Sequence, residues 1–471
     1  MTKPQPLRRR RADPEYAEPV PVPVARWVFQ RLPAGAWLTT RFDAPYLSSD
    51  GGLPWLVQAD AALGLCQALA ACVPEWRRGG VRHALRTLVQ QRVFQIACGY
   101  ADQDDADHLR TDPLFKLACG RAPLRGPALA SQPTLSRLEN AVDRHAVEAL
   151  ATALVHLYIR ARGRTGAPTH VVLDVDGTDD PTHGDQEGSA YHGYYRQHMD
   201  HPLLLFDGTT GQLITAVLRP GNVHGSRFAV LVLRRVVRLL RAAWPAVQLE
   251  VRADSGFGLP RLYRWCEDHG LRYVIGLIPN PVLEQYAAPL LAAAHAQSEA
   301  LGGEKVRLAA DVRHQAGSWA YPRRVVFKAE VLEQGPNTRF VVTNRPDAPL
   351  ALYDWYVDRG AAENWIKDLK NALAADRLSD HRFWANAFRL VLHAAAYWLL
   401  DTLRRWLAPV PEVAHAQLDT LRLQVLKVGG WIEELVESVG ADWFLHLSAH
   451  HPGARLWPHL ARATRAYAYA P

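Results

Sequence analysis

The sequence predicts an α/β core with a mixed sheet, interrupted by a β-rich segment and flanked by helical regions. Five short runs rich in β-branched and aliphatic residues occur between residues 170 and 278, and helical periodicity prevails on both sides. The chain has 471 residues, which exceeds the size at which a single core keeps growing. We therefore expect several structural regions rather than one.

The five predicted strands alternate with helices in a fixed order. Strands are expected at 170–175, 203–206, 212–218, 249–253 and 273–278. Helices are expected at 226–244, between the third and fourth strands, and at 259–269, between the fourth and fifth. The resulting order, βββαβαβ, is that of an RNase-H-like core, a three-layer α/β fold.

The rest of the chain divides into regions around this core. A basic and proline-rich arm is expected at 1–25, where Arg8–Arg11 precede Pro19, Pro21 and Pro23, and a helical N-terminal domain at 26–165. The core then occupies 166–280 and resumes at 349–380 with a helix at 350–373. Between these parts lies a β-rich insertion, and a helical C-terminal region follows.

The insertion and the C-terminal region have their own predicted elements. The insertion, 281–348, is expected to hold a helix at 282–295 and strands at 306–312, 324–332 and 338–343. The C-terminal region, 381–471, is expected to hold helices at 387–406 and 418–436.

Composition narrows the class of protein. The formal net charge is +7 and the pI is near 9.2, which suits a partner made of phosphates. The five cysteines form no CxxC pair and lie in apolar stretches, so we expect reduced core residues. No segment is long and uncharged enough to span a bilayer, which predicts a cytoplasmic protein without a membrane partner.

Two predicted strands end in carboxylates. The first strand delivers Asp174 and Asp176 on one face, because side chains alternate along a strand. The fourth delivers Asp254, just before Gly256. A carboxylate on an apolar strand needs a partner or a metal ion, although an Asp beside a glycine also serves as a turn cap. We favour a metal role, for Asp176 more than for Asp174.

A third acid, Glu363, lies on the helix predicted at 350–373. Tyr356, Arg359, Glu363 and Lys370 fall within an arc of about 60° on this helix, at the edge of an apolar stripe. An ordinary amphipathic helix with an Arg359–Glu363 ion pair is the alternative, and it leaves Tyr356 and Lys370 unexplained.

These motifs together resemble a known family. The spacing Tyr-x2-Arg-x3-Glu-x6-Lys, with an earlier Asp-Gly-Thr and an Asp-Ser-Gly-Phe, is similar to that of the DDE transposases of bacterial insertion sequences that carry the YREK signature. The likeness extends over segments such as 173–187, 218–224, 253–257 and 128–140. The signature helix is a specific signal, whereas Asp-Gly-Thr alone is a weak one.

The resemblance implies a role for each motif residue. Asp176, Asp254 and Glu363 would bind two Mg²⁺ ions, with Mn²⁺ as a possible substitute, and Tyr356, Arg359 and Lys370 would hold phosphates of the transposon end. The 109 residues between Asp254 and Glu363 accord with an insertion before the glutamate.

The resemblance also implies a reaction and its partners. The enzyme would cut and paste DNA through a hairpin intermediate, as a homodimer that joins two terminal inverted repeats and then a target DNA. It would be associated with the nucleoid when bound to DNA. Hairpin formation requires an unstacked base, and Trp319 in the insertion is our candidate to stack on it. A core or turn tryptophan is the alternative.

Other features are assigned more ordinary roles. His183, Asp185, Glu187 and His192 fit no common zinc spacing and predict a polar loop near the site. One helix face is expected to be solvated rather than to track DNA; it holds Arg227, Arg234, Arg238 and Arg241. The N-terminal domain is the candidate for recognising inverted repeats through its basic residues, which are Arg77, Arg78, Arg82, Arg86 and Arg92.

Two alternative functions remain open at this point. A metal-dependent nuclease on the same fold would use the same acids but would never join strands. A domesticated DNA-binding protein would have lost catalysis, yet all three acids and the complete Tyr, Arg, Glu and Lys set are present.

Overall fold

The computed structural model describes residues 46–332, 335–435 and 442–468. The predicted basic and proline-rich arm lies outside these residues. Within them, no helix combines the length and the apolar character needed to cross a membrane.

The centre of the molecule is a mixed sheet of eight strands in the order β10-β11-β12-β9-β8-β2-β6-β7. Strands β2, β8 and β9 are mutually parallel, whereas β6 runs antiparallel to β2, and β7 runs antiparallel to β6 at the edge of the sheet. The core strands are β2 (His170–Gly177), β6 (Leu203–Asp207), β7 (Leu213–Val217), β8 (Gln248–Ala253) and β9 (Arg272–Leu277). With α8 (Ala229–Ala243) and α9 (Pro260–Asp268) between them, the predicted order βββαβαβ is confirmed.

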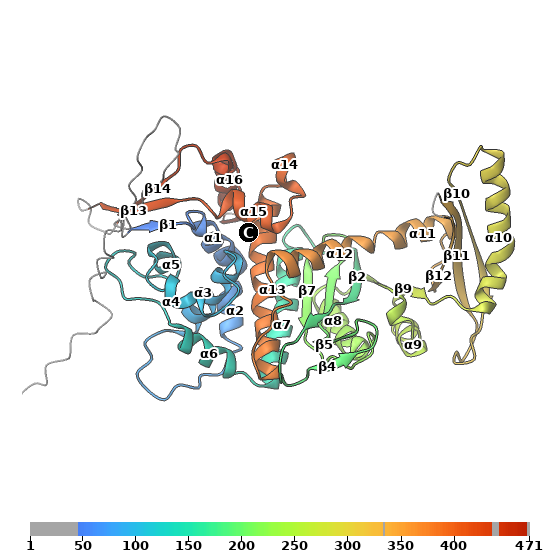
Figure 1. The fold of residues 1–471 in the computed structure, drawn as a ribbon, viewed down its shortest axis with the longest axis horizontal. Coiled ribbons are helices and arrows are strands. Elements are labelled where there is room, and N and C mark those ends of the chain that lie inside the picture. The colour runs from blue at the N-terminus through green and yellow to red at the C-terminus, as the bar shows by residue number, and fades with distance from the viewer. Residues whose placement is uncertain (1–45, 333–334, 436–441, 469–471) are drawn as a thin grey trace, which may run out of the picture.

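The insertion extends the core sheet rather than standing apart from it. It contains α10 (Pro281–Ala300), β10 (Val306–His314), β11 (Arg323–Leu332) and β12 (Gly335–Thr343). β12 pairs antiparallel with β9 through Phe340 and Leu277, so the predicted strands continue the same hydrogen-bonded ladder. The insertion forms one end of an elongated molecule, with α10 outermost (Figure 1).

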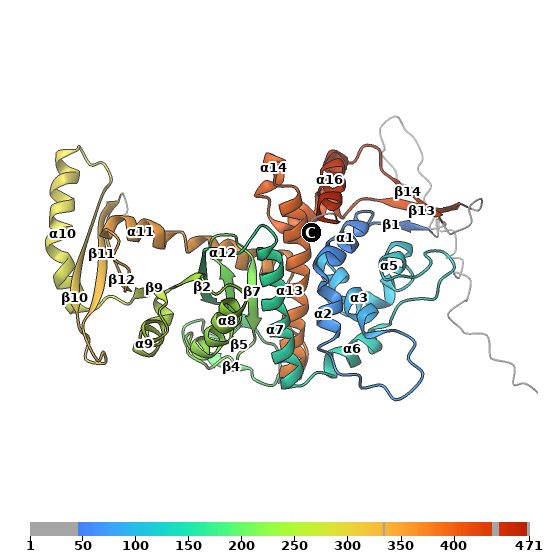
Figure 2. The same ribbon diagram turned by 180° about the vertical axis from the view of Figure 1, so that it is seen from behind.

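The N-terminal and C-terminal regions, which we expected to be separate, form one helical body. At its centre is α13 (Phe383–Trp406), which contacts helices from both regions. Twenty of its residues are buried, so it can be stable only where other elements surround it. Figure 2 shows α13 between the sheet and the N-terminal helices.

The helices of this body come from both ends of the chain. Those before the core are α1 (Leu53–Leu63), α2 (Leu65–Ala70), α3 (Leu85–Ala97), α4 (Asp105–Leu109), α5 (Pro113–Ala118), α6 (Gln132–Asn140) and α7 (Arg144–Gly163). Those after α13 are α14 (Pro411–Ala414), α15 (Leu418–Val425) and α16 (Trp457–Ala468).

The helix predicted at 418–436 is wrong beyond Val425. The chain there forms β13 (Gly430–Leu435), which pairs with β14 (Asp442–Leu447) and with β1 (Leu47–Ser48). Gly429 and Gly430 interrupt the helical pattern, and glycine disfavours a helix interior. Pairing with the next strand, β14, and with the distant β1 then decides the conformation.

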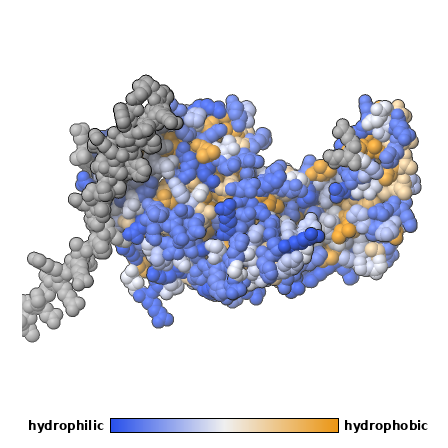
Figure 3. Space-filling model, viewed as in Figure 1, coloured by the Kyte–Doolittle hydropathy of each residue, from blue (hydrophilic) through white to orange (hydrophobic). Residues whose placement is uncertain are grey.

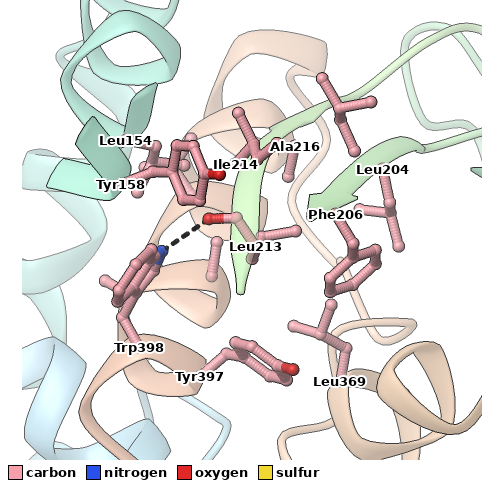
Figure 4. Close-up of a cluster of buried hydrophobic side chains, with 14 of the residues drawn as sticks. Leu154, Tyr158, Leu204, Phe206, Leu213, Ile214, Ala216, Leu369, Tyr397 and Trp398 are labelled. Atoms are coloured by element: carbon pink, nitrogen blue, oxygen red, sulfur yellow. Dashed lines mark hydrogen bonds between the residues drawn. The ribbon is translucent and has the colours of Figure 1, made fainter. Parts of the chain in front are cut away.

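A buried aromatic cluster joins the helical body to the core. Trp398 of α13 donates a hydrogen bond from its indole nitrogen to the Leu213 carbonyl oxygen of β7, over 3.0 Å. Tyr158 of α7, Phe206 of β6 and Tyr397 of α13 lie around this contact (Figure 4). All four rings are buried, so the sheet and the helical body share one hydrophobic core.

The five cysteines are free, and all but Cys72 are buried, as predicted.

The helix predicted at 350–373 is present but irregular. It is divided into α11 (Pro349–Val357), α12 (Gly360–Lys367) and a π-helical turn at Asp368–Ala372. Near Arg359 the backbone hydrogen bonds span three residues instead of four. α11 leads back from the insertion, and α12 runs along the core (Figure 1).

Candidate active site

The two aspartates of the predicted triad lie side by side at one edge of the sheet. Val175 of β2 pairs with Ala253 of β8, and each precedes one of the acids. Because the strands are parallel, Asp176 and Asp254 therefore emerge at the same level. Asp254 also accepts a hydrogen bond from the Gly256 amide over 3.0 Å, so the turn-cap role that we considered for it is present as well.

Asp176 is electrostatically the most unusual of the three acids. Burial raises the pKa of its carboxyl group to about 7, and the neighbouring charge of Asp254 adds to this effect. Two carboxylates that share one site disfavour each other's ionisation. Asp176 therefore needs a nearby cation to remain charged at neutral pH.

Arg359 supplies positive charge at this place. Its Nη1 atom lies 3.1 Å from Asp176 Oδ2, and its Nη2 atom lies 3.3 Å from Glu363 Oε1. The Arg359–Glu363 pair of an ordinary helix is thus present, but Asp176 shares the same guanidinium. The Glu363 side chain remains 57% exposed. Throughout the described part of the chain, no three His, Cys, Asp or Glu side chains converge closely enough to hold a metal ion.

The other members of the helix signature face the same edge of the sheet. The Tyr356 hydroxyl donates a hydrogen bond to the Ala253 carbonyl oxygen, just before Asp254, over 3.2 Å. Lys370 Nζ lies 2.7 Å from Asp179 Oδ1, three residues after Asp176. All four predicted residues of the signature thus contact or adjoin the loops that carry the aspartates.

Most of the sequence matches the model of one protein family. Residues 33–467 match the model of the family described as transposase DDE domain group 1. The chain belongs to this family. It is therefore a DDE transposase, an enzyme that cleaves DNA strands and transfers them.

No curated protein matches the chain significantly. Among solved structures, a cryo-EM structure of the piggyBac transposase synaptic complex with hairpin DNA matches with a TM-score of 0.42 and 11% sequence identity, over 80% of each chain.

Asp174 has a different environment from Asp176, although the two share a strand. In the transposase, Asp174 is 1% exposed and forms a two-pronged ion pair with Arg252 of β8, with distances of 2.6 and 2.7 Å. Arg252 also donates to the Trp355 carbonyl oxygen of α11. This pair therefore links β2, β8 and α11 behind the site and leaves Asp174 without free oxygens for a metal ion.

Glycine positions near the site were missed in the sequence. A Cβ atom at Gly276 of β9 would lie 2.6 Å from the Ser255 amide nitrogen and 2.8 Å from the Tyr356 hydroxyl. Only glycine permits both segments to approach β9 this closely. An isolated glycine inside a strand was the available signal.

The Trp319 ring lies away from solvent. It is 6% exposed and packs edge-on against Tyr263 at 5.7 Å, and the Arg323 guanidinium lies 5.5 Å from its centroid. This is the environment of a core tryptophan, the alternative that we considered. In this conformation the ring cannot stack on a base.

Arg92 is also placed differently from our expectation. Its side chain is 1% exposed and is bonded to Glu139, which pairs with Arg389 of α13 as well. It therefore joins the helical body and cannot contact DNA. Arg78, Arg82 and Arg86 are exposed.

The polar loop after Asp176 and the basic face of α8 have structural roles or are solvated. Glu187 accepts a hydrogen bond from the Phe383 amide at the start of α13. On α8 and just before it, Arg227, Arg234 and Arg238 are exposed, while Arg241 donates to the His269 carbonyl oxygen.

The three acids suit a divalent metal ion. Carboxylate oxygens are the ligands that Mg²⁺ and Mn²⁺ prefer. Burial and the charge of Asp254 raise the pKa of Asp176, and the single guanidinium of Arg359 offsets this effect only in part. The donor set and its charge therefore fit such an ion.

Proposed function

We propose that the transposase belongs to an insertion sequence and moves it by cut-and-paste transposition through a hairpin intermediate. Asp176, Asp254 and Glu363 are its catalytic acids in this proposal. The observation that supports it most is the meeting of Asp176 and Asp254 at adjacent strand ends, with Arg359 linking Asp176 to Glu363.

The acids would hold two Mg²⁺ ions, which would activate a water or a 3′-hydroxyl and stabilise charge on the entering and leaving oxygens. Backbone contacts hold the two aspartates in place. Asp176 belongs to a strand that pairs on both sides, and Asp254 is held by the Gly256 amide. Glu363 is exposed and belongs to a helix, so its side chain can turn toward the aspartates.

Arg359, Tyr356 and Lys370 are proposed to hold phosphates of the transposon end. Guanidinium presents a fork that matches two phosphate oxygens, whereas an ammonium group acts as a point charge. In the structure Arg359 and Lys370 contact the carboxylates of Asp176 and Asp179, and in this proposal phosphate oxygens would replace them. DNA binding would thus exchange these partners.

The proposed partners are the two inverted repeats, the target DNA and a second copy of the chain. Exposed Arg78, Arg82 and Arg86 support repeat recognition by the helical body. On the face shown in Figure 3, the concave edge between the helical body and the insertion is mostly hydrophilic, which suits a nucleic acid.

A cleavage assay tests this proposal. Purified protein is incubated with Mg²⁺ and a duplex carrying the inverted repeat that flanks its gene, and the products are resolved on a denaturing gel. Nicks, hairpins and joined strands are expected for the wild type and should be absent from Asp176→Ala, Asp254→Ala and Glu363→Ala. Glu284→Gln, an exposed acid on α10, is the matched control and should behave like the wild type.

The alternatives give different results in the same assay. Cutting without joined products would indicate a nuclease, and binding without any metal-dependent cutting would indicate a DNA-binding protein. Cleavage that persists in one alanine variant would remove that residue from the site.

A further inference from the structure

A small hairpin beside the acids is not used by the function proposed above. It consists of β4 (Ala190–His192) and β5 (Gln197–Asp200), with β3 (Asp180–Pro181) paired to β5. Its tip is the turn Gly193–Arg196, which the hydrogen bond from the Arg196 amide to the His192 carbonyl oxygen closes over 2.8 Å.

This hairpin is tied to the residues of the site. Gln197 donates from Nε2 to Asp179 Oδ2 over 3.0 Å, and Asp179 also binds Lys370. At the other end, a Cβ atom at Gly177 would lie 2.8 Å from His201 Nε2, so the imidazole lies against the residue after Asp176. These contacts hold the hairpin against the residues that follow Asp176.

A series of aromatic rings connects this imidazole to the tip. The ring centroids of His201 and His192 are 5.0 Å apart, those of His192 and Tyr195 are 5.1 Å apart, and those of Tyr195 and Tyr194 are 5.1 Å apart. Burial raises the pKa of Tyr195 to about 12, and the charges of Asp179, Asp176 and Asp254 add to this effect. Tyr194 is the outermost ring of the series.

Tyr194 packs against Tyr195 on one side and is otherwise exposed to solvent. Its side chain is 84% exposed, the highest value for a large apolar or aromatic residue in the described ranges. Two residues on, Arg196 is exposed and has a left-handed backbone with φ of 55°, which is strained for a residue other than glycine. An exposed aromatic ring beside a cation is the combination that binds unpaired nucleotides.

We propose that Tyr194 stacks on an unpaired DNA base beside the phosphate that is cut, and that Arg196 contacts the adjacent phosphate. This inference rests on the proposed function, because it requires DNA at the acids. The Tyr194 ring can stack on any of the four bases, since every base has a π-face. Tyr194 contacts Tyr195 edge-on and is otherwise exposed, so its ring remains available to a base.

The chain offers a matched control on the same hairpin. Tyr191 of β4 is 55% exposed and contacts His198 edge-on. It adjoins His192 in the strand, and neighbouring strand residues face opposite sides. Tyr191 therefore faces away from the ring series that leads to the acids, and Tyr191→Ala should leave DNA binding and cutting unchanged.

The test is a double-mutant cycle between side chain and base, measured by fluorescence anisotropy without metal ions. The probe is a duplex that carries the flanking inverted repeat and two unpaired nucleotides at its outer end. Two further probes each lack the base of one of these nucleotides. For the wild type, loss of one particular base should weaken binding about 10-fold. For Tyr194→Ala the same loss should have no further effect, whereas Tyr194→Trp and Tyr191→Ala should behave like the wild type.

The outcomes separate this inference from the proposed function. If the effects of Tyr194→Ala and base removal simply multiply at both positions, the stacking inference is wrong. Cutting of the same DNA with Mg²⁺ is measured in parallel, and failure of the wild type to cut would overturn the proposed function and this inference together. Normal cutting, combined with independent effects of Tyr194→Ala and base removal on binding, would overturn the inference alone. Circular dichroism confirms that each variant is folded.

Discussion

The guanidinium of Arg359 lies between Asp176 and Glu363, 3.1 Å from one carboxylate and 3.3 Å from the other. It neutralises part of the charge that a divalent ion would neutralise. Arg359 thus has two proposed partners, the acids before DNA binds and a phosphate afterwards. Metal binding and DNA binding should be linked through this side chain.

We predict that Arg359→Ala binds Mn²⁺ more tightly than the wild type in the absence of DNA, by several-fold, because the acids lose their competing cation. Cleavage should nevertheless fall, since a phosphate contact is lost. Isothermal titration with Mn²⁺ measures the first effect and the gel assay the second. Arg238→Ala, an exposed arginine of α8, is the control. Weaker Mn²⁺ binding by Arg359→Ala would contradict this role.

Asp174→Asn should destabilise the fold by roughly 3–5 kcal/mol, because it leaves the Arg252 guanidinium buried without its counter-charge. Urea denaturation followed by circular dichroism measures this. The exposed pair Arg307–Asp354 is the comparison, and Asp354→Asn should cost less than about 1 kcal/mol. If Asp174→Asn keeps full stability but loses metal affinity, Asp174 is a ligand after all.

Gly276→Ala should lower DNA cleavage at least about 10-fold and reduce stability by roughly 1–3 kcal/mol, because the added methyl group meets Ser255 and Tyr356 beside Asp254. The control is Gly317→Ala, where a Cβ atom meets nothing within 4 Å. Both variants are assayed for cleavage and for thermal unfolding. Unchanged cleavage by Gly276→Ala would show that the approach of these segments is not required.

A second pair of buried carboxylates predicts how stability depends on pH. Asp180 and Asp200 are directly opposite on β3 and β5, and both are 0% exposed. Burial raises the pKa of Asp180 to about 8, with further contributions from Asp200 and Asp376 against that of Lys370, and burial raises the pKa of Asp200 to about 7. An unfolded aspartate titrates near 3.9.

Between about pH 4 and pH 8 the folded state binds more protons than the unfolded state, so this pair makes the free energy of unfolding fall as pH rises. Asp200→Asn removes one of the two groups. Its stability relative to the wild type should therefore increase from pH 5 to pH 8.5, by at least about 2 kcal/mol.

Urea denaturation at several pH values measures this difference. Comparing the two proteins removes common contributions, such as that of His201, whose pKa burial lowers to about 4. Asp354→Asn should give a constant difference from the wild type across the same range. A constant difference for Asp200→Asn would mean that the pair is ionised in the folded protein.

Much of the fold was predictable because its signals are local. The alternation and β-branched content of 170–175 and 249–253 placed β2 and β8, and with them the positions of Asp176 and Asp254. The spacing of Tyr356, Arg359, Glu363 and Lys370 likewise depends only on helical periodicity. The structure keeps these residues at one edge of the sheet despite the irregular turns between them.

The partners that individual side chains contact were less predictable. Asp174 and Asp176 look alike in the sequence, yet Arg252 from β8 pairs with one and Arg359 contacts the other. The sequence offered Trp319 both as a stacking candidate and as a core tryptophan, and in the structure Tyr263 and Arg323 pack against its ring. In each case the deciding partner is far away along the chain.

The sequence by itself therefore determined the order of the core elements and the family, and it led to the proposal that Asp176, Asp254 and Glu363 are the catalytic acids. Only the tertiary structure decided that β12 continues the core sheet, that both ends of the chain enclose α13, and that the Tyr194 hairpin is held beside Asp176. The physical reason is range: periodicity and turn preference act between neighbours, whereas burial, ion pairing and strand pairing depend on residues that only folding brings together.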